Sequence, residues 1–399
     1  MQFKLRDYQQ KASDAAVSFF LDDTKKHNAL IVAATGSGKS LIIADIAYRL
    51  DSDVLVFCPQ KEILQQNYAK MKTYGVKCSM YSASVNQKVI SKVTFCTIGS
   101  VKNYSELFKH FKYVLVDEAH YINPERGMYK DFLKQLSCKV VGLSATPYRL
   151  EVDVDMDWKT KKFKSAKPYL QMLTDYKKPV FKEIIYNIQI DELLEKGYLS
   201  DLKYYYQPPK GWDENRLFKN SSGTDFTDDS VKRMYNKTGF EYHLVNIVRR
   251  LLSPKSGIKR NGILVFTRFV REAEMLANNI DGCAYISGDM TKNNRERILK
   301  EFEQGKIKVL ANANVLVVGY DRPDLDTVVL ATPTLSLARY YQEIGRAIRP
   351  HPSKECGWIV DLAGNINRFG EVSDLKLLQN SNGKWAVFSN GRQLTNIRF

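Results

Sequence analysis

A glycine-rich loop between an apolar strand and a helix is the first feature that could do chemistry. Residues 33–40 read AATGSGKS and lie between the apolar run ALIV and LIIADIAYRL, whose apolar spacing favours a helix. Small residues let backbone N–H groups surround phosphates, while Lys39 adds positive charge and Ser40 can ligate Mg²⁺. The candidate phosphate contacts are Thr35, Gly36, Ser37, Gly38, Lys39 and Ser40. Ala33 replaces the glycine of the strict pattern, so the order of strand, loop and helix carries this prediction.

Two adjacent carboxylates follow the apolar run YVLV at residues 113–116. Asp117 can hold Mg²⁺ while Glu118 orients and deprotonates an attacking water, and one carboxylate cannot fill both roles at once. Alone, such a pair indicates a solvated acidic turn. Beside a phosphate loop it indicates phosphoryl transfer to water.

A third set of charged residues lies about three hundred positions after the loop. Gln342, Arg346 and Arg349 are spaced by four and three residues, which places them on one face of a helix. Alone, they would form an exposed basic stripe. Paired with the phosphate loop, Arg346 and Arg349 become candidate arginine fingers, because a guanidinium stabilises charge on the transferring phosphoryl oxygens. The three are therefore grouped with Asp117 and Glu118 as catalytic candidates.

The elements that must position these groups alternate between strand and helix patterns. Short β-branched runs recur between helix-like stretches from residue 28 to 147 and again from 261 to 361, which predicts two α/β lobes with parallel sheets covered on both faces. Ligands of such sheets bind at the carboxyl ends of the strands. The predicted units are a first lobe (1–150), a connector with some helix (151–260), a second lobe (261–365) and a C-terminal extension (366–399).

The connector and the extension carry weaker signals. The lysine run near residue 160 is more typical of a solvated face than of a phosphate contact, and the tyrosines of KYYYQPPKGW are more typical of a core than of base stacking. IDELLEKG predicts a short helix. The last residues alternate like a β-hairpin around Asn390-Gly391.

Composition bounds the class of protein. The chain has 399 residues with 44% apolar and 26% charged residues, enough to fold into more than one domain, and no run of about 18 apolar residues that could span a membrane. Without a signal-peptide pattern the expected location is cytoplasmic. Six widely spaced cysteines predict reduced thiols and not a zinc site. A formal charge of +16 predicts a polyanionic partner, but charge alone does not separate DNA, RNA and anionic membrane.

The tetrad DEAH at 117–120, the loop ATGSGKS and the later SAT at 144–146 together resemble the superfamily 2 DEAD/DEAH-box helicases. Within that group the chain is similar to compact bacterial and phage DNA helicases of the DNA-repair and branch-migration type. The resemblance implies two tandem RecA-like lobes, ATP and Mg²⁺ as cofactors, and coupling of hydrolysis to lobe movement through His120, Ser144 and Thr146. It also implies adenine recognition by Arg6, Tyr8 and Gln9.

The same resemblance implies a nucleic-acid track across both lobes. Asp321 would face the nucleotide, while Val317 and Val318 stand where many relatives carry threonines, which puts one hydroxyl contact in doubt. The residues expected along the track, mostly against phosphates, are Pro59, Lys61, Gln66, Thr97, Thr267, Arg268, Ser287, Gly288 and Gly319.

Catalytic groups divided between two lobes imply a motor, since hydrolysis requires closure and product release permits opening. The expected function is therefore that of an ATP-driven DNA helicase or translocase, acting on branched DNA, in repair or in recombination. DEAH in place of DEAD, and QxxGRxxR without a leading histidine, favour DNA over RNA. The alternatives are an RNA-remodelling ATPase and a nucleic-acid-binding module with a decayed motor, which the intact set of catalytic candidates disfavours.

Overall fold

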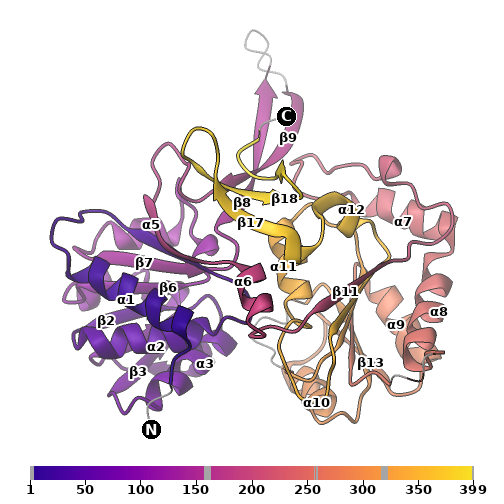
Figure 1. Ribbon diagram of the computed structural model, residues 1–399, viewed down its shortest axis with the longest axis horizontal. Coiled ribbons are helices and arrows are strands. Elements are labelled where there is room, and N and C mark those ends of the chain that lie inside the picture. The colour runs from indigo at the N-terminus through magenta and orange to yellow at the C-terminus, as the bar shows by residue number, and fades with distance from the viewer. Residues whose placement is uncertain (1–3, 157–162, 256, 258, 316–321, 398–399) are drawn as a thin grey trace.

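The computed structural model describes residues 4–156, 163–255, 257, 259–315 and 322–397. Within these ranges two α/β lobes lie side by side, each with helices on both faces of its sheet (Figure 1). The predicted fold class, two RecA-like lobes with parallel sheets, is confirmed. Among the described helices, none is long and apolar enough to cross a bilayer.

Lobe 1 is built on a sheet in which neighbouring strands are mostly parallel. Its order is β10-β1-β7-β6-β2-β5-β3-β4. The strands are β1 (Ala29–Ala33), β2 (Val54–Phe57), β3 (Cys78–Ser82), β4 (Gln87–Lys88), β5 (Val93–Cys96), β6 (Tyr113–Asp117), β7 (Lys139–Ser144) and β10 (Glu183–Ile188). The helices of this lobe are α1 (Asp7–Leu21), α2 (Lys39–Leu50), α3 (Lys61–Lys72), α4 (Ile98–Val101) and α5 (Met128–Leu133).

The central strands of lobe 1 are buried on both faces, as continuous apolar runs predict. Along β1, Ile31 packs into the core on one face and Leu30 into the core on the other. Helices α1, α2 and α3 cover the first face, while aromatic residues such as Phe108 and Phe132 fill the second. The sheet is thereby fixed in register, and its strand ends are held in place.

Lobe 2 repeats the architecture with a smaller sheet ordered β11-β16-β15-β12-β14-β13. Its paired strands are parallel throughout. They are β11 (Leu202–Tyr206), β12 (Ile263–Thr267), β13 (Cys283–Ser287), β14 (Val309–Ala313), β15 (Thr327–Ala331) and β16 (Gly357–Asp361). The helices are α7 (Asp228–Thr238), α8 (Phe240–Leu252), α9 (Val270–Asn279), α10 (Lys292–Glu303), α11 (Leu337–Ile344) and α12 (Asn365–Phe369).

Residues 151–260, expected as a connector, supply one strand to each sheet. β10 pairs with β1 in lobe 1, and β11 pairs with β16 in lobe 2. The short helix α6 (Ile190–Glu195) lies between them where IDELLEKG predicted a helix, and α7 and α8 pack on lobe 2. Each of these two segments forms one edge strand with little hydrophobic periodicity. The sequence alone therefore could not assign β10 or β11 to a lobe.

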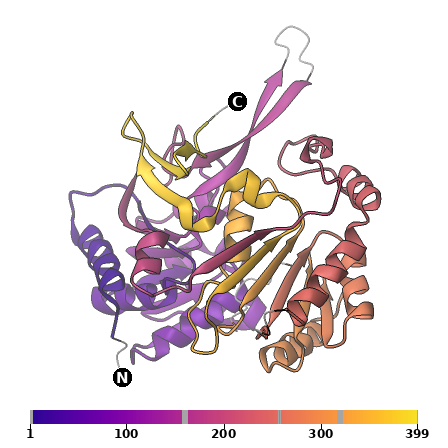
Figure 2. The same ribbon diagram turned by 45° about the vertical axis from the view of Figure 1, so that its right-hand side comes forward.

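Two further elements lie above the junction of the lobes. The antiparallel hairpin of β8 (Tyr148–Met156) and β9 (Phe163–Met172) projects from lobe 1, as Figure 2 shows from a second side. Beside it, β17 (Leu375–Gln379), β18 (Trp385–Ser389) and β19 (Arg392–Gln393) form a small C-terminal sheet. The predicted turn at Asn390-Gly391 is confirmed: both residues have positive φ and join β18 to β19.

The C-terminal sheet contacts both lobes. On the side of lobe 2, Gly370, directly after α12, packs so closely against Ser389 of β18 that an added Cβ would clash with the Ser389 hydroxyl. On the side of lobe 1, Gln189, directly after β10, exchanges two hydrogen bonds with Leu377, at 2.7 and 3.2 Å. The sheet therefore bridges the lobes at one end of the cleft.

Gly142 in β7 offers a test of the packing under the strand ends. An added Cβ there would lie 2.6 Å from the Ala119 Cβ and 2.8 Å from the Phe181 ring. We expect Gly142→Ala to lower the free energy of unfolding by about 1–3 kcal/mol, the usual cost of overpacking a core. Urea unfolding measures it. Gly99→Ala is the control, because nothing lies within 4 Å of its added Cβ, and equal stability of the two variants would contradict this packing.

Candidate functional site

The phosphate loop connects β1 to α2 at the carboxyl end of β1. Gly36 and Gly38 have φ of +84° and +83°, a conformation that glycine adopts without strain. A Cβ on Gly38 would lie 2.5 Å from the Gln9 amide, so the loop leaves no room for a larger residue. Gly38 directly precedes α2, whose first residues are Lys39 and Ser40. The loop thus presents backbone N–H groups and a helix N-terminus to one cavity, a geometry suited to phosphates.

The two carboxylates lie opposite the loop at the end of β6. The Lys39 ammonium is 3.2 Å from a Glu118 carboxylate oxygen, in an ion pair that is largely shielded from solvent. Burial and the neighbouring Glu118 raise the pKa of Asp117 to about 6. Burial also acts to raise the pKa of Glu118, but the Lys39 ammonium outweighs it and holds that pKa below its usual value. Glu118 is therefore ionised at neutral pH.

Asp117 has a partner that the sequence did not reveal. The Asn67 side chain of α3 donates to an Asp117 oxygen at 2.8 Å, and the Glu118 N–H donates to the other oxygen at 2.9 Å. Both contacts fix the carboxylate. Asp117 and Ser40 line the same cavity as Lys39, and carboxylate and hydroxyl oxygens are donors that Mg²⁺ prefers.

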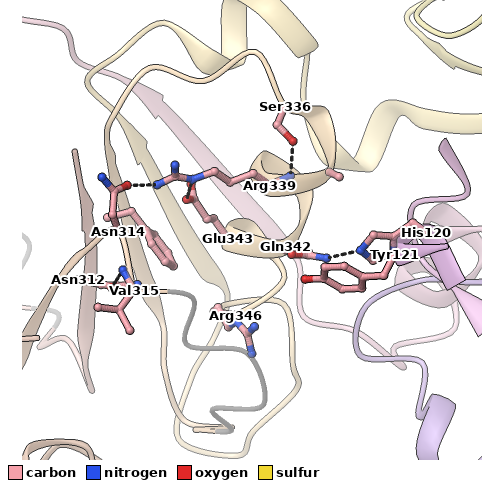
Figure 3. Close-up of a pocket in the computed structure, with 12 residues that line it drawn as sticks. His120, Tyr121, Asn312, Asn314, Val315, Ser336, Arg339, Gln342, Glu343 and Arg346 are labelled. Carbon is pink, nitrogen blue, oxygen red and sulfur yellow. Dashed lines mark hydrogen bonds and ion pairs between the residues drawn. The ribbon is translucent and has the colours of Figure 1, made fainter. Parts of the chain in front are cut away.

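His120 connects the carboxylates to the next strand end and to lobe 2. Its Nδ1 lies 2.9 Å from the Ser144 hydroxyl and 3.2 Å from the Thr146 hydroxyl. Its Nε2 lies 3.4 Å from the Gln342 amide nitrogen of α11 (Figure 3). Burial lowers the pKa of His120, so the ring is neutral at neutral pH. The three predicted coupling residues therefore form one network that reaches across the lobes.

The arginines of lobe 2 face the phosphate loop across a cavity of about 500 Å³. The prediction that they share a helix face with Gln342 was wrong: α11 ends at Ile344 with Gly345, a poor helix former, as its C-cap, and Arg346 and Arg349 lie in the turn and bend that follow. Gln342, Arg346 and Arg349 line this cavity together with Lys39 and Glu118. Arg346 is close enough to Glu118 for its charge to help lower the pKa of that carboxyl. The sequence-predicted catalytic residues, although separated by more than two hundred positions, thus share one cavity between the lobes.

The expected adenine-binding residues lie against the outer side of the phosphate loop. The Tyr8 hydroxyl and the Gln9 amide donate to the Ser37 carbonyl at 3.0 and 2.8 Å. The Arg6 guanidinium lies 4.4 Å from the centre of the Tyr198 ring. Tyr198 follows α6 and lies 5.3 Å from Tyr8, ring centre to ring centre. It is a candidate base-stacking residue that only the fold could bring here.

The expected strand contacts of lobe 1 gather at neighbouring strand ends. Pro59 follows β2, Lys61 begins α3, and Thr97 follows β5, where its hydroxyl lies 3.0 Å from that of Ser82. Gln66 differs from them, because it lines the cavity between the phosphate loop and the arginines, called the nucleotide cavity below. Its contact with nucleic acid stays a prediction, and its position also allows a contact with the nucleotide.

In lobe 2 the expected contacts lie at the ends of β12 and β13. Thr267 and Ser287 are buried, while Gly288 is exposed with open space around it. Arg268 is buried and bound within the lobe: it pairs with Asp225 at 2.9 Å and Asp228 at 2.8 Å. These contacts occupy its guanidinium with carboxylates of its own lobe, so in this structure it has a structural role. Gly319 and Asp321 lie outside the described residues, as do Val317 and Val318.

Comparisons with known proteins match both lobes. A family model described as type III restriction enzyme, res subunit, matches residues 2–149, and one described as helicase conserved C-terminal domain matches residues 244–351. The chain belongs to the superfamily 2 helicases, a class of ATP-hydrolysing enzymes. The resemblance to superfamily 2 helicases that the motifs indicated is thereby confirmed.

Individual relatives are distant and mostly longer than this helicase. It is 24% identical over 400 residues to putative ATP-dependent helicase IRC3 of Saccharomyces cerevisiae, covering 94% of this chain and 53% of that protein. It is 22% identical to DNA 3'-5' translocase XPB2 of Sulfurisphaera tokodaii, covering 87% and 79%. The solved type ISP restriction-modification enzyme LlaBIII bound to DNA shares the fold, with a TM-score of 0.65, 18% identity and coverage of 90% and 27%. The chain thus spans about half of the yeast relative.

Gly345, directly after α11, is a further residue at the contact between the lobes. An added Cβ would lie 2.5 Å from the Thr35 Cγ2 of the phosphate loop, so this glycine sets how closely α11 approaches lobe 1. We expect Gly345→Ala to lower kcat for ATP at least tenfold, because the arginines are pushed back from the phosphates. ATP affinity and the melting temperature should change little. Steady-state hydrolysis, with Gly99→Ala as the control, tests this; an unchanged kcat would show that the contact is not required.

Proposed function

We propose that this chain is an ATP-dependent DNA translocase or helicase that couples hydrolysis between its lobes to movement along DNA. The observation that carries the proposal is the division of the catalytic groups. Lys39, Asp117 and Glu118 belong to lobe 1, and Arg346 and Arg349 approach them from lobe 2. An active site assembled from two bodies makes each hydrolysis cycle a cycle of closing and opening.

The residues of the cavity suit the phosphates of ATP. The loop N–H groups and Lys39 would bind the β- and γ-phosphates, which releases Glu118 from its ion pair with Lys39 to orient the attacking water. Ser40 and Asp117 would hold Mg²⁺, which when bound neutralises charge on the phosphate oxygens. Arg346 and Arg349 would stabilise the charge that develops on the transferring group.

The network around His120 offers a route from hydrolysis to movement. His120 contacts Ser144 and Thr146 in lobe 1 and approaches Gln342 in lobe 2. A change at Glu118, which lies 3.4 Å from the His120 ring, alters one end of this network. Loss of the γ-phosphate would therefore weaken the contact between the lobes on the side that faces the nucleic acid.

DNA is the favoured substrate, with RNA as the alternative. The chain carries DEAH in place of DEAD, a formal charge of +16, and relatives that include a DNA translocase. Remodelling of branched DNA, in repair or recombination, is the role we propose for it. The contacts expected at Pro59, Lys61 and Thr97 read backbone and not sequence, which suits a motor that must travel along any strand.

The ATPase rate in the presence of different nucleic acids tests the substrate. At low salt we expect single-stranded and forked DNA to raise kcat more than RNA of the same length does. Stronger stimulation by RNA would replace DNA with RNA as the substrate. Absence of stimulation by every nucleic acid would overturn the motor itself.

Two substitutions test the division of roles between the lobes. Lys39→Ala should abolish turnover and weaken ATP binding, because it removes the charge that holds the phosphates. Arg346→Ala should retain ATP binding but lower hydrolysis roughly a thousandfold, as the loss of an arginine finger does. Nucleotide binding by fluorescence and single-turnover hydrolysis separate the two effects. Equal loss of ATP binding in both variants would refute the assignment of Arg346.

A further inference from the structure

A second cavity, of about 320 Å³, opens on lobe 1 outside the site just described. Its size is at the lower end of ligand pockets, which span about 300–1,000 Å³. Apolar and aromatic side chains make up much of its wall. It is lined by Pro59, Gln60, Ile98, Tyr121, Asn123, Arg126, Gly127, Met128 and Tyr129.

The cavity lies at the same sheet edge as the nucleotide site. Its walls come from the segments that follow β2, β5 and β6, which are neighbours in the sheet, so their carboxyl ends lie together. Pro59 belongs to it, and Ile98 directly follows Thr97. The cavity therefore adjoins the strand ends where phosphate contacts are expected.

The loop between β6 and α5 holds the cavity open. The Asn123 side chain accepts hydrogen bonds from the Glu125 and Arg126 N–H groups at 2.9 and 3.2 Å, which fixes the turn. Gly127, with φ of +111°, then redirects the chain into α5. Met128 remains 47% exposed and Tyr121 37% exposed. The loop thus presents a thioether and an aromatic ring to solvent, with the exposed cation Arg126 between them in sequence.

We propose that this cavity receives an unpaired base of the bound strand. A thioether and aromatic rings contact the flat face of any base, which gives affinity without sequence preference. Arg126 offers a positive charge to the adjacent phosphate. This inference rests on the proposed function, since it presupposes that a nucleic-acid strand crosses lobe 1.

Tyr121 would connect an occupied cavity to catalysis. It lines this cavity, the nucleotide cavity with Glu118, and a third cavity between the lobes that Gln342 and Arg346 also line. Its ring lies beside that of His120, at 4.6 Å between ring centres (Figure 3). A base that enters beside Tyr121 therefore contacts a side chain that also faces the groups expected to hydrolyse ATP.

Met128→Ala tests the proposal, because this exposed side chain lies outside the nucleotide cavity and its loss leaves the fold intact. The probes are an oligothymidylate and an abasic deoxyribose-phosphate chain of the same length, each titrated in the ATPase assay of the full chain. We expect the oligothymidylate concentration for half-maximal stimulation to rise about fivefold in Met128→Ala. The value for the abasic chain and the rate without nucleic acid should not change. Leu21→Ala, another exposed apolar residue of lobe 1, should behave like the wild type.

Each other outcome overturns the proposal in a distinguishable way. Equal weakening of both probes would mean that Met128 contacts the backbone and not a base. If Met128→Ala is stimulated like the wild type by both probes, the cavity has another occupant, such as a peptide of a partner protein. The motor function would still stand. Failure of both probes to stimulate the wild-type chain would remove the proposed DNA-stimulated function together with this inference.

Discussion

The approach of α11 to the phosphate loop is the contact on which the rest of the structure depends. Gly345 packs against Thr35 so closely that a single methyl group would not fit. This distance decides whether Arg346 and Arg349 lie in the same cavity as Lys39. A parallel sheet in each lobe holds its own strand ends rigidly, so the relative position of the lobes is the variable that assembles the site or takes it apart.

The C-terminal sheet limits how the two lobes can move relative to each other. The C-terminal sheet packs against lobe 2 at Gly370 and is hydrogen-bonded to lobe 1 at Gln189. Asn396 at its far end binds the backbone of β9, and Lys384 pairs with Asp175 at 2.6 Å. Because one end of the cleft is tied in this way, we infer that the lobes would open by rotation about the tied end.

Much of the fold and of the nucleotide site could be predicted from local sequence. The phosphate loop and the paired carboxylates each depend on a few neighbouring residues and on a strand or helix whose periodicity is strong. The arginines could be chosen from their spacing, but the helix expected to carry them ends at Ile344, before both of them. The contributions of Tyr198, Asn67 and Tyr121 could not be predicted, because each depends on segments that only the tertiary fold brings together. Arg268 illustrates the converse: its motif indicates a nucleic-acid contact, but carboxylates from before α7 and within it bind its side chain.

In the proposed cycle, ATP and DNA together bring the two lobes into the catalytic arrangement. Energy transfer between labels at exposed positions 11 of α1 and 242 of α8 measures this directly. In a Glu118→Gln background that binds ATP without hydrolysing it, we predict that transfer rises when ATP and single-stranded DNA are added, and falls when ADP replaces ATP. The transfer efficiency would be the same with ATP and with ADP if nucleotide did not drive lobe closure, and that result, in a labelled protein that hydrolyses ATP normally before Glu118 is replaced, would refute the proposed cycle.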